Sequence, residues 1–251
     1  MYPEAFFKLH DITEEIIKER IASKTHHGDF IDKIIEVCND PNSPVSKEMI
    51  KAQGSIFFSA GFETTSNCLS TLCYHLALNP DIQEKLREEI LGIDADDEIN
   101  HENISELHYL EAAILENLRI FPPITMQARI CKKDAEIKGI NIKKGTYVQV
   151  SIYATHHDPE FFPEPQMFKP ERFLKENAED LIPYTFQAFS GGPRLCLGQR
   201  FAMAEMKICM AKLMRKFRIK TCPSTDLKFL PGSFLGILGF EEIFLTLEPR
   251  N

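Results

Sequence analysis

The sequence predicts a mainly α-helical fold with small β-sheets. Apolar residues recur at helical spacing through most of residues 3–120 and again through residues 198–218, whereas apolar and polar residues alternate only within residues 135–152 and 226–247. The 251 residues are 43% hydrophobic and 26% charged, as in folded globular chains. A chain of this length suits one large domain or two small ones.

Charge and cysteine content narrow the function classes. The chain has 29 Lys and Arg against 37 Asp and Glu, a formal charge of −8, so we do not expect nucleic acid as a partner. Its seven cysteines include no Cys-x-x-Cys pair, which indicates reduced thiols in a cytosol-facing protein. Residues 1–10 mix apolar and charged types, so we expect neither a signal peptide nor a membrane anchor in this sequence.

Two charged surface helices are predicted within residues 3–38, separated by Gly28. After a turn cluster, Ser46 is placed to cap a long helix that Pro80 stops. Polar side chains recur too often along this helix for a membrane span, so we expect it to run through a protein core.

The middle of that helix reads Ala60-Gly-Phe-Glu-Thr-Thr. A glycine inside a helix costs about 1 kcal/mol relative to alanine, and a threonine hydroxyl that bonds to the preceding turn bends the helix. The carboxylate of Glu63 therefore lies beside the hydroxyl of Thr64 at a weak point of a buried helix. The alternative is a core helix with one satisfied polar pair.

Two helices are expected next, a charged one over residues 81–92 and one that Ser105 caps and that runs through Ile120. The second places Glu116 and Arg119 three residues apart on one face. Beyond it we expect a small antiparallel sheet within residues 124–152.

The remainder is expected to hold a proline-rich loop, one strong helix and a hairpin. The loop covers residues 161–186, the helix runs from Gly198 to Arg218, and the hairpin spans residues 226–247. Residues 194–220 contain eight Lys or Arg against one acid, Glu205. This excess is either a solvated face with cations at a helix end or a basic docking surface.

Cys196 lies in a glycine- and proline-rich stretch, Phe189-Ser-Gly-Gly-Pro-Arg-Leu-Cys-Leu-Gly198, just ahead of that helix. The helix dipole and the unpaired N–H groups at a helix N-terminus favour a thiolate over a thiol, and Arg194 adds a positive charge. This arrangement predicts a bound soft metal or an electrophile. A small, inert buried cysteine is the alternative.

Four segments together resemble the cytochrome P-450 family. The fixed positions of the haem-binding loop are Phe189, Gly192, Arg194, Cys196 and Gly198, and the other segments are Ala60–Thr65, Glu116-x-x-Arg119 and Pro170-Glu-Arg-Phe173. The resemblance implies a cytochrome P-450 fold and a single haem-binding domain over residues 1–251. It also implies the C-terminal portion of a longer chain, whose N-terminal half and membrane anchor are absent.

The resemblance also implies roles for individual residues. Cys196 is the axial thiolate of haem b, Thr64 hydrogen-bonds dioxygen at the haem, Glu63 relays protons, and Ala60 and Gly61 open a groove for the haem. Arg129 and Arg194 reach the haem propionates, His156 lies near the haem edge, and Glu116, Arg119 and Arg172 form a buried structural network. Ile124, Thr125, Phe234 and Leu235 contact the substrate.

The activity implied is a monooxygenase that inserts one oxygen atom of O2 into an apolar small molecule. Electrons come from NADPH through a flavoprotein reductase, with cytochrome b5 as a further partner, docked at the basic surface of residues 194–220. Residues 129–136 look like those of animal microsomal members of broad substrate range, on the cytosolic face of the endoplasmic reticulum membrane, which act in xenobiotic metabolism.

Three alternatives remain open at the sequence level. One is a haem-thiolate isomerase or dehydratase that needs no reductase, against which the intact Glu63–Thr64 pair argues. Another is a truncated, non-catalytic fragment that does not hold haem by itself. Without the family resemblance, a cysteine-nucleophile enzyme would be the choice, but no histidine lies near Cys196 in the sequence.

Overall fold

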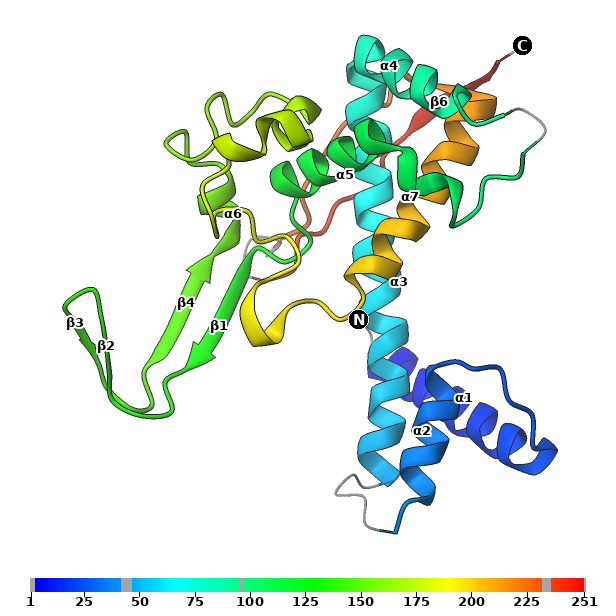
Figure 1. Ribbon diagram of the computed structural model, residues 1–251, viewed down its shortest axis with the longest axis vertical. Coiled ribbons are helices and arrows are strands. Elements are labelled where there is room, and N and C mark those ends of the chain that lie inside the picture. Colours follow the sequence, from blue (N-terminus) through cyan, green and yellow to red (C-terminus); the bar gives the residue numbers. More distant parts are fainter. Residues whose placement is uncertain (1–2, 42–46, 95–96, 232–235, 251) are drawn as a thin grey trace. The chain divides into compact units, whose positions relative to one another are not determined.

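The computed structural model describes residues 3–41, 47–94, 97–231 and 236–250, which group into two compact units, residues 1–64 and 65–251. The chain is mainly helical with small two-stranded sheets, which confirms the predicted fold class (Figure 1). The single haem-binding domain stays a prediction. Within the described ranges, no helix combines the length and apolar character that a membrane span needs.

The first unit consists of α1 (Pro3–Ser23), α2 (Phe30–Asn39) and the N-terminal part of α3 (Lys47–Leu78). The two predicted surface helices are therefore present. Asp29 caps α2, since its side chain accepts a hydrogen bond from the Asp32 N–H at 3.1 Å. A Cβ atom at Gly54 would lie 2.1 Å from Thr13 Cγ2, so glycine there permits the close approach of α1 and α3. The predicted cap of α3, Ser46, lies outside the described residues.

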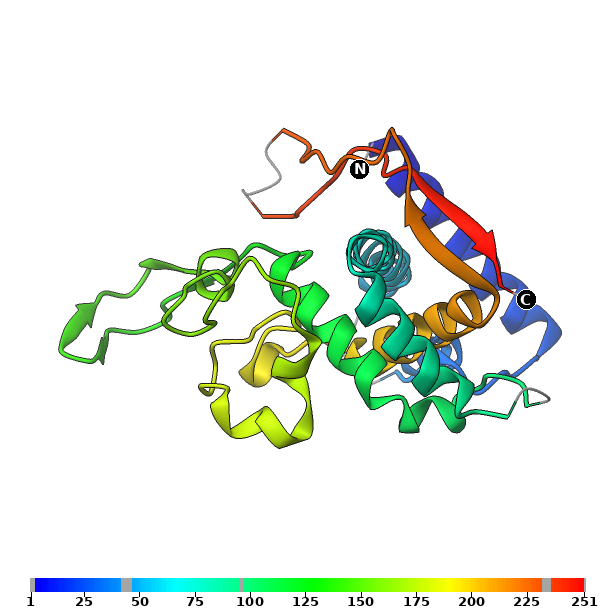
Figure 2. The ribbon, with the colours of Figure 1, turned by 90° about the horizontal axis from the view of Figure 1, so that it is seen from above.

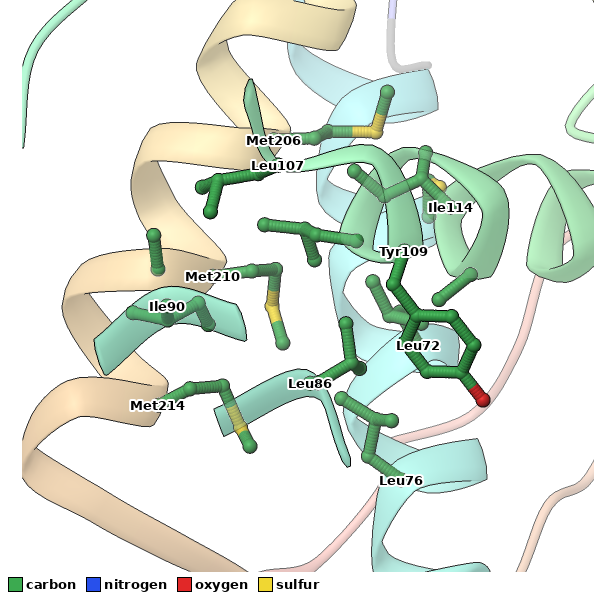
Figure 3. Close-up of a cluster of buried hydrophobic side chains, with 14 of the residues drawn as sticks. Leu72, Leu76, Leu86, Ile90, Leu107, Tyr109, Ile114, Met206, Met210 and Met214 are labelled. Carbon is green, nitrogen blue, oxygen red and sulfur yellow. The ribbon is translucent and has the colours of Figure 1, made fainter. Parts of the chain in front are cut away.

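The second unit is built around the C-terminal part of α3, with α4 (Pro80–Leu91), α5 (His108–Ile120) and α7 (Gln199–Lys216). Figure 2 looks down α3 and shows these three helices on one side of it. Their facing side chains form one core. It includes Leu72, Leu76, Leu86, Ile90, Leu107, Tyr109, Ile114, Met206, Met210 and Met214 (Figure 3). This core fixes α5 and α7, the two helices that carry or flank the candidate site.

The predicted Ser105 cap is wrong. Ser105 lies inside a separate 3₁₀ helix, η1 (Asn103–Glu106), and its hydroxyl donates to the Glu102 carbonyl at 2.7 Å. The first N–H groups of α5 are instead satisfied by a carboxylate from α4: Glu89 accepts from Tyr109 N–H at 2.6 Å and Leu110 N–H at 2.9 Å. A charged acceptor at a helix N-terminus serves as a cap and also favours the helix dipole.

Three antiparallel strand pairs complete the described fold of the second unit. They are β1 (Met126–Ile130) with β4 (Tyr147–Ser151), β2 (Ala135–Ile137) with β3 (Ile140–Ile142), and β5 (Phe217–Thr221) with β6 (Leu245–Pro249). Antiparallel pairing within residues 124–152 was predicted, but as one small sheet: the structure has two separate two-stranded sheets there, β1–β4 and β2–β3.

The tail differs from its prediction. Its end pairs with β5 as β6, and among the tail residues that the structure describes only a short stretch around the Phe229–Phe240 bridge has hairpin pairing. The preceding helix ends at Lys216 rather than Arg218, because Phe217 already has extended backbone angles and begins β5.

Short elements connect the sheet to the cysteine loop. They are α6 (Ile152–His156) and the 3₁₀ helices η2 (Pro170–Phe173), η3 (Lys175–Asp180) and η4 (Gly192–Arg194). The proline-rich region predicted as irregular thus contains two short 3₁₀ helices, η2 and η3.

Candidate functional site

Glu116 and Arg119 lie on one face of α5 and are both fully buried. Arg119 donates from Nε to Glu116 Oε2 at 2.7 Å and from Nη2 to Oε1 at 2.9 Å. From the proline-rich region, Arg172 Nε and the Lys169 N–H donate to Glu116 Oε1 at 3.3 and 3.0 Å. The structure therefore brings Glu116, Arg119 and Arg172 into one hydrogen-bonded network.

Backbone carbonyls accept further hydrogen bonds from the two guanidinium groups of this network. Arg119 donates to the carbonyls of His156 and Pro165, both at 2.8 Å, and Arg172 Nη2 donates to the Glu164 carbonyl at 3.0 Å. Two cations against one buried carboxylate are stable here because the carbonyls of residues 156–165 satisfy them. The network thus fixes the path of the chain between α6 and η2.

His156 links the network to the cysteine loop. Its Nδ1–H donates to the Arg119 carbonyl at 3.1 Å, and its Nε2 accepts the backbone N–H of Gln187 at 2.9 Å. The ring also stacks on Phe186, with centroids 5.2 Å apart. Burial lowers the pKa of His156 to about 3, so the neutral tautomer that these two bonds require is the stable one. Both ring nitrogens are engaged within the protein, and the predicted contact with a haem edge stays a prediction.

The cysteine loop turns tightly between Phe189 and Gln199. The Cys196 N–H donates to the Phe189 carbonyl at 2.9 Å, and the Leu195 N–H donates to the Gly192 carbonyl at 3.1 Å. Gly192 has φ +67°, a left-handed conformation that glycine adopts without strain. Gly198 is the N-cap residue of α7. Cys196 is exposed at the end of this turn, so its sulfur is accessible to a ligand.

The exposed residues around the cysteine loop and on β1 suit a ligand that has a flat apolar ring and acidic substituents. Leu195, Leu197 and Phe201 are 52%, 85% and 74% exposed, which is unusual for neighbouring large apolar residues. Arg129 and Arg194 are exposed, and among the described residues no carboxylate pairs with either guanidinium. Haem combines an apolar ring, a thiolate-accepting iron and two propionates, so these residues suit it.

The predicted oxygen-activation residues belong to the other unit. Thr64 Oγ donates to the Ala60 carbonyl at 2.6 Å, the bond to the preceding turn expected from the sequence, and α3 continues through Gly61 without interruption. Glu63 is half-buried, and Gly61 is exposed with open space around the position of a Cβ atom. Glu63 and Thr64 lie in the first unit and Cys196 in the second, and their joint action at one site stays a prediction.

The predicted substrate contacts are partly described. Ile124 forms an antiparallel bridge with Ile237, and the Thr125 N–H donates to the Gly236 carbonyl at 2.8 Å. The tail therefore runs beside Ile124 and buries Thr125, while Ile124 stays exposed. Phe234 and Leu235 lie outside the described residues. The assignment of all four to a substrate pocket stays a prediction.

Most of the Lys and Arg side chains in residues 194–220 form ion pairs or hydrogen bonds within the chain. Four cations form ion pairs: Lys207 with Glu111, Lys212 with Glu98, Arg218 with Glu84, and Lys220 with Glu248. Arg215 donates to the carbonyls of Ile93, Asp94 and Asp97. Within the described ranges, Arg194, Arg200 and Lys216 have no acidic partner, so the free positive charge lies at the loop and the two ends of α7.

Three polar residues at the loop were not identified from the sequence. Gln127, Gln187 and Ser190 form a side-chain network against the cysteine loop, with a Ser190 Oγ to Gln127 Oε1 distance of 2.7 Å. No local pattern marks them, because Gln127 lies about 60 residues from its partners. Asn117 was also missed: its buried amide donates to the Cys68 carbonyl at 3.0 Å and to Thr71 Oγ at 3.1 Å, and so ties α5 to α3.

Comparisons with known proteins agree with this geometry. Residues 1–240 match the family model "Cytochrome P-450". Cytochrome P-450 3A16 of Mus musculus is 38% identical over all of this chain and 51% of its own length. Cytochrome P-450 3A7 of Homo sapiens is 38% identical over 94% of the chain and 48% of its own. Cytochrome P-450 3A29 of Sus scrofa is 41% identical over 75% and 38%. The chain spans about half the length of the curated relatives it matches.

Proposed function

Because the chain belongs to the cytochrome P-450 family, we propose that it serves as the haem-thiolate part of a monooxygenase that inserts one oxygen atom of O2 into an apolar small molecule. One observation carries the proposal. Cys196 is exposed on a loop that the buried network holds through His156, and its apolar neighbours are exposed with it.

Cys196 would hold haem b by binding the iron through its sulfur. The side chains of Leu195, Leu197 and Phe201 would lie against the ring and lose their exposure to water, which favours binding. Arg129 and Arg194 would bind the propionates. Bound haem would supply an iron at which dioxygen is activated, and a thiolate ligand would donate electron density that favours O–O cleavage.

Glu63 and Thr64 would handle the protons that oxygen activation consumes. The Thr64 hydroxyl donates to the Ala60 carbonyl, so its oxygen remains able to accept a hydrogen bond from a donor or water. Glu63 is half-buried, so its carboxylate can exchange protons with solvent while lying next to Thr64 in sequence. General acid–base transfer of this kind contributes roughly 10²- to 10⁴-fold to a rate.

Electrons would come from NADPH through a flavoprotein reductase, with cytochrome b5 as a second partner, for a parent protein at the endoplasmic reticulum membrane. Of the cations in residues 194–220, Arg200 and Lys216 have no acidic partner among the described residues and are not assigned to haem, so they are the best candidates for docking an acidic surface. We expect Arg200→Glu to slow electron transfer at low salt more than Lys212→Glu does, because Lys212 already pairs with Glu98. Equal effects, or rates that ignore ionic strength, would contradict this surface.

The substrate would be an apolar small molecule of the kind that microsomal monooxygenases of broad range oxidise in xenobiotic metabolism. Support comes from the cytochrome P-450 3A relatives and from the segment Arg129–Glu136. Within this segment Arg129 lies on β1, and β2 begins at Ala135.

The test is the Soret band of the reduced, carbon monoxide-bound chain after haem is supplied. We expect a far red-shifted band, which reports thiolate ligation, and its loss in Cys196→Ser. A band typical of nitrogen-ligated haem, or no haem uptake, would favour a non-catalytic fragment. A thiolate band with turnover of peroxides but no reductase-dependent oxidation would favour an isomerase or dehydratase.

A further inference from the structure

A row of side-chain hydrogen bonds supports the cysteine loop from β1. Ser190, the residue after Phe189, donates from Oγ to Gln127 Oε1 at 2.7 Å. Gln127 Nε2 donates to Gln187 Oε1 at 3.1 Å, and Gln187 Nε2 donates to the Tyr184 carbonyl at 2.8 Å. All three side chains are half-buried, so water competes with these bonds less than on an open surface.

The direction of this row follows from its last acceptor. A carbonyl can only accept, so the Gln187 amide must turn its NH2 group toward Tyr184 and its oxygen toward Gln127. Gln127 must then present NH2 to Gln187 and its own oxygen to Ser190. Each amide has one orientation that satisfies both neighbours, so the row holds Gln127 Oε1 in a fixed place.

Two features meet at Gln127 Oε1. Besides the Ser190 hydroxyl, it faces Arg129 Nη2 at 3.4 Å, from the same strand. On the other side, Ser190 is adjacent to Phe189, whose carbonyl accepts the Cys196 N–H. Gln127 therefore touches both the arginine assigned to a propionate and the loop assigned to the thiolate.

Ser190 supports a specific role for this contact. Its φ is +65°, a left-handed conformation that glycine would adopt without strain and serine adopts with some. The residue at this strained position is serine and not glycine, and its hydroxyl forms the hydrogen bond to Gln127. A contact that offsets backbone strain is one that holds the loop in a single conformation.

We propose that Gln127 is a positioning residue that couples Arg129 to the Cys196 loop, so that the cation for a propionate and the thiolate are held in one fixed arrangement. This inference rests on the proposed function for its consequence, but the coupling itself is a property of the chain without haem. Removal of the Gln127 amide should loosen the loop while leaving the buried network at Glu116 in place.

The first measurement is hydrogen exchange of the haem-free chain, followed in the peptide that covers residues 189–198. We expect Gln127→Leu and Ser190→Ala each to speed exchange of this peptide about threefold or more, as loss of a half-buried hydrogen bond should do. The double variant should exchange no faster than the faster single one, because both remove the same bond.

Two further variants serve as controls. Gln149→Leu changes an exposed glutamine on the partner strand β4, opposite Ala128, and should leave the exchange unchanged. Gln127→Glu keeps an oxygen for Ser190 and Arg129 and should keep most of the protection, which also guards against a fold that fails with leucine. Wild-type exchange in Gln127→Leu, or additive effects in the double variant, would overturn the proposal.

The second measurement uses the haem-loaded chain. Gln127→Leu should lower the fraction of the carbon monoxide-bound form with the thiolate-type Soret band, Gln127→Glu should restore it, and Gln149→Leu should not alter it. An unchanged fraction with faster loop exchange would overturn the coupling to the thiolate. If the unchanged chain takes up no haem, the proposed function fails, whereas the exchange data still decide whether Gln127 holds the loop.

Discussion

The buried network at Glu116 and the loop at Cys196 are joined through His156, yet they are built in opposite ways. Glu116 and Arg119 are both 0% exposed, and their charged groups bond to partners within the chain. Cys196, Leu197 and Arg194 are exposed on the loop. The network is complete in itself, whereas the loop presents a thiol, apolar surface and cations together.

This difference separates residues that stabilise the fold, in the network, from residues that are available to bind a ligand, on the loop. A buried ion pair contributes through the penalty for breaking it, so a change in the network should affect stability first. An exposed loop held by a few backbone hydrogen bonds and one half-buried side-chain bond contributes little to stability, so a change there should affect ligand binding first. The predictions that follow test this separation, from the largest expected change in unfolding free energy to the smallest.

Glu116→Ala should have the largest effect. It removes the only carboxylate in the described network and leaves Arg119 buried without a counter-charge, which should lower the free energy of unfolding by about 3–5 kcal/mol. Urea unfolding followed by circular dichroism measures this loss. The matched control, Glu136→Ala on exposed β2, should change stability by less than about 0.5 kcal/mol. Similar small losses in both variants would mean that the network is not structural.

Acidification should produce the next largest effect, counted per pH unit. Burial lowers the pKa of His75 to about 4 and that of His156 to about 3, from an ordinary value of 6.5. Between these values the unfolded chain binds protons that the folded chain excludes, so stability is full above pH 6.5 and falls as the pH decreases toward 4. Each histidine should contribute up to about 1.4 kcal/mol per pH unit.

Unfolding measured from pH 7.5 to 4.5 tests this slope. The His75 ring stacks between Phe121 and Phe168, so phenylalanine suits this site. His75→Phe should reduce the number of protons taken up on unfolding by about one, and so lower the slope of unfolding free energy against pH, even if it lowers stability overall. A slope in His75→Phe equal to that of the parent chain would show that His75 is protonated in the fold.

Sequence reasoning identified the parts of both regions that depend on local spacing. The pairing of Glu116 with Arg119 follows from their three-residue separation on a helix, and the turn at Cys196 follows from its glycines and proline. Contacts between distant segments had no such signal. The capping of α5 by Glu89, the pairing of β6 with β5, and the bond between Ser190 and Gln127 join residues 20 to 63 positions apart. Such contacts depend on packing, which no local pattern encodes.

Leu197→Ser should affect binding and leave stability nearly unchanged. The side chain is 85% exposed in the chain itself, so the unfolding free energy without haem should change by less than about 0.5 kcal/mol. If haem covers this leucine, its affinity should fall roughly tenfold, as expected for loss of one buried apolar side chain. Haem titration by absorbance measures this. Leu91→Ser, also an exposed leucine, should alter neither quantity, and an unchanged haem affinity in Leu197→Ser would place the ligand elsewhere.

Cys196→Ser should have the smallest effect on stability and yet abolish the thiolate-type Soret band. The serine side chain has nearly the same form as that of cysteine, and the Cys196 side chain is exposed. The loop hydrogen bond to the Phe189 carbonyl is made by the Cys196 backbone N–H and not by its side chain. The haem-free variant should therefore unfold within about 0.3 kcal/mol of the parent chain, as for other exposed substitutions. A large loss of stability would mean that the thiol packs inside the fold. The loop would then resemble the buried network, and the separation between the two regions would fail at its most important residue.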